Sequence, residues 1–63
     1  MLDLREIRKS RGYTLKKIAE AVKTTPVTIW RYENGKRKPS VKMAKKLGPL
    51  YGIHWTDFFK DVA

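Results

Sequence analysis

The side chains that most often carry catalysis or bind metal ions are scarce in this sequence of 63 residues. His54 is its one histidine, cysteine is absent, and its six carboxylates show no paired arrangement. General acid–base catalysis and metal binding both need several such groups held close together. The sequence has no glycine-rich phosphate loop, and so short a chain leaves little room for a dry cleft. We therefore expect no enzyme, no metal site and no cofactor.

Positive charge is the chemistry in which the sequence is rich. Fifteen lysines and arginines face six acidic residues, which gives a net charge of +9 at pH 7. Such an excess repels itself, and a polyanion relieves the repulsion because its phosphates release counterions when cations neutralise them. Nucleic acid is therefore the first candidate partner. A basic ribosomal or membrane-surface protein would carry similar charge, so the pattern of residues has to decide.

The elements that must position these cations are predicted from helical periodicity and capping residues. No strand is expected, and the predicted helices are five short ones, over about residues 2–11, 14–22, 25–34, 40–51 and 55–60. Hydroxyl side chains suited to cap helices stand at Thr14, Thr25 and Ser40. Because proline breaks helical backbone bonding, we expect a kink or a restart at Gly48–Pro49. His54 is expected to cap the last helix and to face solvent.

Apolar residues at helical spacing define the expected core of one domain over residues 1–63. The first three helices are expected to bury Leu4, Ile7, Leu15, Ile18, Ala19, Val22, Ile29 and Tyr32. The fourth helix is expected to bury Val41, Ala44 and Leu47. The last helix is expected to close the core with Trp55, Phe58 and Phe59. The chain lacks an apolar stretch long enough for a membrane span or a secretory signal, so we expect a soluble, cytoplasmic protein.

The segment from Thr14 to Gly35 contains two short helices joined by a turn of three or four residues. Ala19 lies midway along the first of them, where its small side chain lets the second helix cross closely at a steep angle. Apolar side chains then fill the wedge between the helices, namely Ile18, Val22 and Ile29. The outward face of the second helix is left free to enter the major groove of DNA. This pattern predicts a helix-turn-helix.

At these positions the sequence resembles the Xre-type family, the helix-turn-helix domains of phage Cro proteins and repressors and of many bacterial regulators. The resemblance covers nearly the whole chain, from about Leu4 to Phe59. The motifs that carry it are Leu4-Arg5-x-x-Arg8, Thr14-Leu15-x-x-Ile18-Ala19-Glu20, Thr28-Ile29-x-x-Tyr32-Glu33-Asn34-Gly35-Lys36-x-x-Pro39-Ser40 and Tyr51-Gly52-Ile53-x-Trp55-x-x-Phe58-Phe59. It implies a compact all-α five-helix bundle like that of lambda repressor, and a sequence-specific transcriptional regulator, expected to be a repressor, that binds double-stranded DNA.

The resemblance also implies roles for individual residues. Residues 25–34 correspond to the recognition helix, whose base-reading positions fall on Thr25, Pro26, Val27 and Arg31. We expect Arg31 to read guanine, because a guanidinium bonds O6 and N7 together; a phosphate contact is the alternative. A thymine methyl is expected to contact Val27 or Thr28. An ion pair between the first and third helices, which orients the recognition helix, corresponds to Arg8 and Glu33.

Phosphate contacts are expected around the helix-turn-helix. Backbone N–H groups of Leu15 and Lys16 point at an anion in this geometry, and the helix dipole assists them. The cations around this surface are Lys16, Lys17, Lys36, Arg37 and Lys38. Trp30 projects outward, either to hold the sugar-phosphate backbone or to cover a neighbouring helix at the rim. A solvated face away from the groove is expected for Lys42, Lys45 and Lys46.

Two positions depart from the family pattern. Lys23 stands where the turn usually has glycine, and a side chain in left-handed backbone costs about 1 kcal/mol. Leu15 stands where the second helix often begins with a glutamine that contacts phosphate. The turn is therefore expected to be strained or differently shaped, and only the backbone amide of Leu15 remains for a phosphate.

Other functions and assemblies remain open. A protein-interaction module, such as an antitoxin or co-regulator, would use Trp30 and the C-terminal aromatic side chains, with or without DNA binding. RNA binding is disfavoured, because readers of single strands usually present aromatic side chains on a sheet. We expect a homodimer that forms only on DNA, and no small-molecule ligand. The candidate dimer contacts, unless they belong to the core, are Phe58, Phe59 and Val62.

Overall fold

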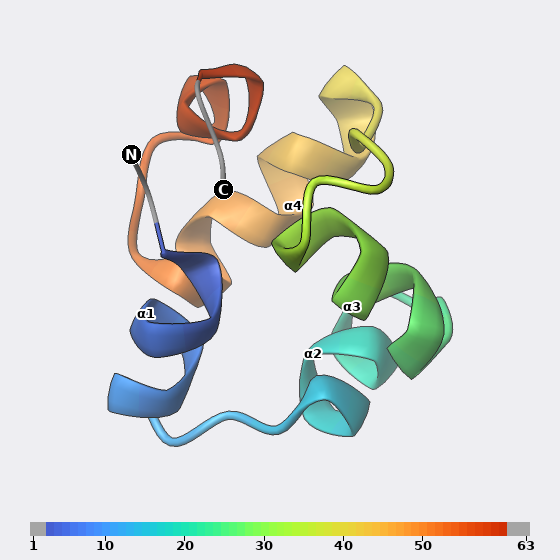
Figure 1. Ribbon diagram of the computed structural model, residues 1–63, viewed down its shortest axis with the longest axis vertical. Coiled ribbons are helices and arrows are strands. Elements are labelled where there is room, and N and C mark those ends of the chain that lie inside the picture. Colours follow the sequence, from blue (N-terminus) through green and yellow to red (C-terminus); the bar gives the residue numbers. More distant parts are fainter. Residues whose placement is uncertain (1–2, 61–63) are drawn as a thin grey trace.

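The computed structural model describes residues 3–60, which form four α-helices and a short 3-10 helix (Figure 1). Their bounds are α1 (Leu4–Ser10), α2 (Leu15–Ala21), α3 (Pro26–Glu33), α4 (Val41–Tyr51) and η1 (Trp55–Phe59). The all-helical class is as predicted from the sequence. The prediction of five helices needs correction, because the last segment is a single 3-10 stretch of five residues and only four α-helices form.

Side-chain caps fix where the helices begin. Thr14, Thr25 and Ser40 each accept a hydrogen bond from the backbone N–H three residues later, at 3.1, 3.3 and 3.1 Å. These three caps are confirmed, and Asp3 caps α1 in the same way at 3.1 Å. His54 is exposed and caps η1 through Nδ1, which accepts the Thr56 N–H, as predicted. A cap satisfies one of the N–H groups that a helix start leaves without a partner.

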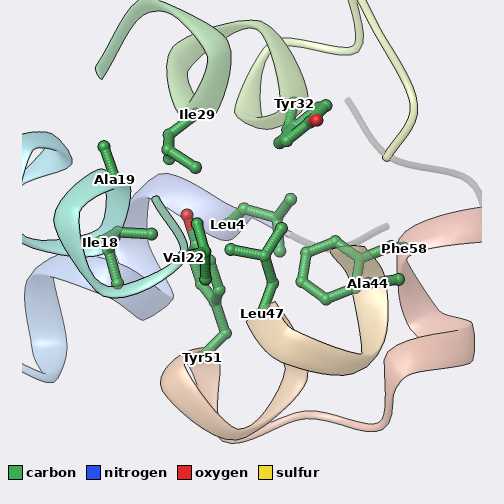
Figure 2. Close-up of a cluster of buried hydrophobic side chains, with 10 residues drawn as sticks. All are labelled: Leu4, Ile18, Ala19, Val22, Ile29, Tyr32, Ala44, Leu47, Tyr51 and Phe58. Carbon is green, nitrogen blue, oxygen red and sulfur yellow. The ribbon is translucent and has the colours of Figure 1, made fainter. Parts of the chain in front are cut away.

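The core lies where the four α-helices and η1 meet, and Figure 2 shows its ten buried apolar side chains converging. They are Leu4, Ile18, Ala19, Val22, Ile29, Tyr32, Ala44, Leu47, Tyr51 and Phe58. The predictions that Val41 and Phe59 are buried in the core are wrong. Val41 is 50% exposed in the first turn of α4, at the edge of that helix's buried stripe. Phe59 is 37% exposed and packs edge-on against Trp55, with ring centroids 6.2 Å apart.

The predicted restart at Gly48–Pro49 does not occur, because α4 continues through Pro49 to Tyr51. Proline lacks an N–H and so removes one backbone bond, a small loss near the end of a helix. Gly48 is buried because the chain after α4 folds back onto it: Ile53 N–H donates to the Gly48 carbonyl at 3.0 Å. A Cβ on Gly48 would lie 2.9 Å from the Ile53 carbonyl oxygen. This close approach anchors η1 to α4.

The described helices are short and amphipathic. None of those within residues 3–60 is both long and apolar enough to cross a membrane. Of the predicted dimer contacts, Phe58 is buried in the core, whereas Val62 lies outside the described residues.

Candidate nucleic-acid interface

The turn between α2 and α3 sets the crossing of these two helices, which pack against each other in Figure 1. Lys23 has a φ of +58°, and no other non-glycine residue among those described has a positive φ. The backbone N–H of Thr24 donates a hydrogen bond to the Ala19 carbonyl at 2.9 Å and so closes the turn. Lys23 therefore adopts the left-handed backbone that glycine occupies most readily. The strain costs about 1–2 kcal/mol.

One face of α3 is buried and the opposite face is open. Ile29, Tyr32 and Glu33 point into the protein. The exposed residues of the helix and its cap are Thr25, Pro26, Val27, Trp30, Arg31 and Asn34. Val27 is 55% exposed, so this face carries apolar as well as polar side chains. Thr28 is half-buried, and its hydroxyl shares a 2.9 Å hydrogen bond with that of Thr25, so it lies at the margin of the open face.

The ion pair expected between α1 and α3 is present and buried. Arg8 Nε donates to Glu33 Oε2 at 2.7 Å, and Arg8 Nη1 donates to the Tyr13 carbonyl at 2.9 Å. Tyr51 adds a contact that sequence reasoning missed, because its hydroxyl donates to the same Glu33 oxygen at 2.7 Å. Burial, and then the hydrogen bond and charge of Glu33, raise the pKa of Tyr51 well above its ordinary value. Glu33 thus joins α3 to both α1 and α4.

A hollow of about 300 Å³ lies between α1, the start of α2 and the end of α3. Its lining includes Leu15 at the first turn of α2 and Trp30, which is 47% exposed. Arg5 and Lys9 line the same hollow and are exposed, although sequence reasoning did not select them. Their spacing of four residues on α1 was the available signal, since it places both on one face of a helix. The hollow brings two cations beside an exposed indole.

The start of α2 offers further positive groups near this hollow. Lys16 and Lys17 are exposed in its first turn, and the Lys17 N–H is taken by the Thr14 cap at 3.1 Å. The N–H groups of Leu15 and Lys16 precede it and have no acceptor within a helix. The Leu15 side chain is half-buried against the core, which leaves its backbone as the polar group at this position.

The basic turn after α3 is folded back onto the end of that helix. The N–H groups of Lys36 and Arg37 both donate to the Arg31 carbonyl, at 2.9 and 3.3 Å. Lys36, Arg37 and Lys38 are all exposed. These backbone bonds hold the start of the basic turn against the end of α3, the helix that carries the exposed Arg31. Arg37 and Lys38 also line a hollow of about 250 Å³ that reaches Phe59 in η1.

Comparison with known proteins gives matches along almost the whole chain. Residues 4–58 match the profile of a family described as Helix-turn-helix. Over 59 residues the chain is 41% identical to the uncharacterized HTH-type transcriptional regulator YqaF of Bacillus subtilis (strain 168), an alignment covering 94% of this chain and 78% of that protein. Among solved structures no significant match is found. The range 4–58 contains α1, α2, α3 and the basic turn.

Proposed function

Because this chain belongs to the Xre-type helix-turn-helix family and is a DNA-binding transcriptional regulator, we propose that it is a cytoplasmic repressor that reads its operator in the major groove with α3. The observation that carries the proposal is the open face of α3 opposite a buried anchor. Thr25, Pro26, Val27 and Arg31 are exposed, while Glu33 on the same helix is fixed by Arg8. A recognition helix needs this combination of a free face and a fixed orientation.

Base reading is assigned to the first two turns of α3. Arg31 donates two parallel hydrogen bonds to guanine O6 and N7, which discriminates that base by about 1–3 kcal/mol. Val27 contacts a thymine methyl, since it is exposed and offers no hydrogen bond. Thr25 and Pro26 lie at the base edges at the N-terminal end of the helix. Thr28 takes part through its methyl group, because its hydroxyl is engaged by Thr25.

Phosphate contacts flank this helix on both sides. On one side are the N–H groups of Leu15 and Lys16, the side chains of Lys16 and Lys17, and the hollow with Trp30, Arg5 and Lys9. On the other side is the basic turn of Lys36, Arg37 and Lys38. Such contacts set the register of a protein on the duplex and give a steep dependence on salt.

The test is a selection from random duplexes, followed by titration of the selected duplex and of a scrambled one at several salt concentrations. We expect one motif, a preference of roughly 10³-fold or more, and binding that weakens steeply with salt. Arg31→Ala should relax one base position and cost about 1–3 kcal/mol on the selected duplex. Lys42→Ala is the matched control, because Lys42 is an exposed cation on α4 that lines neither hollow of the interface. Equal binding of all duplexes, or none, would contradict the proposal and favour a protein partner.

A further inference from the structure

A second surface combines apolar lining with positive charge that the proposed DNA contact leaves unused. It consists of two adjoining hollows, of about 430 and 380 Å³, which share Lys45 and Pro49 on α4. We call their combined surface the α4 groove. The first hollow extends to Ile53 and Trp55 beyond α4, and the second extends to Ala21 at the end of α2 and to Leu50. None of the residues assigned above to bases or phosphates lines it.

The cations of the α4 groove pair with no acidic side chain of residues 3–60. Lys23, Lys45 and Lys46 line it and are exposed. Within residues 3–60 the salt bridges join Arg8 to Glu33 and Lys60 to Asp57 and involve none of these lysines. No aspartate or glutamate lines either hollow. Three positive charges therefore surround an apolar surface without compensation from the described part of the chain.

The lysine at the middle of the groove is held close to its aromatic wall. Lys45 Nζ lies 5.1 Å from the centre of the Trp55 ring, a distance at which the ring attracts the cation. The imidazole ring of His54 stacks on the same Trp55, with ring centroids 5.8 Å apart. The positive charge of Lys45 and the apolar surface of Trp55 thus lie side by side in the groove. A ligand that meets both must itself carry negative charge next to an apolar group.

We propose that the α4 groove binds an acidic segment of a partner protein, whose apolar side chain packs against Pro49, Ile53 and Trp55. Carboxylates of that segment bond to Lys45 and Lys46. The several apolar side chains of the groove favour a peptide over nucleic acid, because the apolar side chain of a protein segment covers them, whereas a phosphate contact uses the cations alone. Since the groove shares no residue with the DNA interface, the chain binds its operator and this partner together. The inference goes beyond operator reading and does not depend on it.

The experiment selects binders from a random library of displayed twelve-residue peptides and measures the enriched peptides, labelled with a fluorophore, by anisotropy without DNA. We expect acidic peptides with one aromatic or aliphatic residue among the charges. Lys45→Glu should weaken them by about tenfold or more, because it places like charges together. Lys42→Glu is the matched control: it reverses a lysine of the same helix that lines neither hollow, and binding should change by less than about threefold.

A second readout locates the peptide. The chain has two tryptophans, so Trp30→Phe leaves Trp55 as the only one, and its emission should shift when the peptide binds. Enriched peptides without acidic residues would overturn the proposal. Equal weakening by Lys45→Glu and Lys42→Glu would also overturn it, because bulk charge would then explain binding. Displacement of the peptide by duplex DNA would place it on the DNA interface, with the same consequence.

Discussion

Glu33 shows how one buried side chain positions α3, the helix that we propose reads DNA. Its carboxylate accepts from Arg8 of α1 and from Tyr51 of α4, and no buried side-chain polar atom among residues 3–60 is left without a hydrogen bond. A buried ion pair adds little net stability, but removing one partner leaves an uncompensated charge and costs about 3–5 kcal/mol. The cluster of Arg8, Glu33 and Tyr51 therefore contributes mainly to geometry and little to net stability. It fixes the rotation of α3 and, with it, the direction in which Arg31 points.

The raised pKa of Tyr51 predicts a loss of stability at alkaline pH. In the unfolded chain its pKa is about 10. Above that pH the unfolded state releases a proton that the folded state keeps, so the free energy of unfolding falls as pH rises. The contribution is complete below about pH 10, and above it wild type should lose up to about 1.4 kcal/mol per pH unit relative to Tyr51→Phe. Urea unfolding of both proteins between pH 9 and 11 measures this; parallel pH curves would contradict it.

The left-handed backbone of Lys23 predicts that glycine stabilises the protein at this position. Lys23→Gly removes about 1–2 kcal/mol of strain and adds about 0.5–1 kcal/mol of unfolded-state entropy. The free energy of unfolding should rise by about 0.5–1 kcal/mol, measured by urea denaturation. Lys42→Gly, on the exposed face of α4, is the control and should lower it by a similar amount. A loss of stability in Lys23→Gly would refute the argument from backbone strain.

Two neighbouring substitutions in α4, Gly48→Ala and Pro49→Ala, both raise helix propensity but should change stability in opposite directions. Pro49 is exposed near the end of α4, so Pro49→Ala restores a backbone N–H without a clash and should stabilise by about 1 kcal/mol or less, because the freer unfolded chain offsets part of the gain. Gly48→Ala should destabilise in spite of better helix propensity, because its Cβ would meet the Ile53 backbone at 2.9 Å. Thermal unfolding of the two variants measures both signs. If both variants were stabilised, the contact between α4 and residues 53–55 would not constrain Gly48.

The features that could be predicted from the sequence depend on residues that lie close together along the chain. The caps at Thr14, Thr25 and Ser40 depend on residues three positions apart, and periodicity gave the buried sides of α2 and α3. The errors concern contacts between distant segments. Val41 matches the pattern of α4 but lies beyond the core, and Pro49 is tolerated because of where the helix ends. Tyr51 was missed as a partner of Glu33 because 18 positions separate them and no motif relates them.

The distribution of charge governs how copies of the whole chain meet. Each carries a net charge of +9, and the cations lie on several faces: the DNA interface, the basic turn and the α4 groove. Two free copies therefore repel each other, and the repulsion is screened only at short range at physiological salt. We expect a contact between copies to use Phe59, which is exposed near the basic turn, whereas Phe58 is buried and unavailable. DNA phosphates remove this repulsion.

The chain should therefore be a monomer in free solution and should bind its operator as two copies. Sedimentation velocity at micromolar concentration should show only the monomer without DNA. With a duplex that carries two half-sites about 34 Å apart it should show two chains per duplex. A duplex with one half-site scrambled is the control and should bind one chain more weakly, because the second copy then has no bases to read. Phe59→Ala should reduce cooperativity between half-sites while the affinity for a single half-site stays within about threefold. A tight dimer in the absence of DNA would show that the contact between copies outweighs the repulsion of their charges.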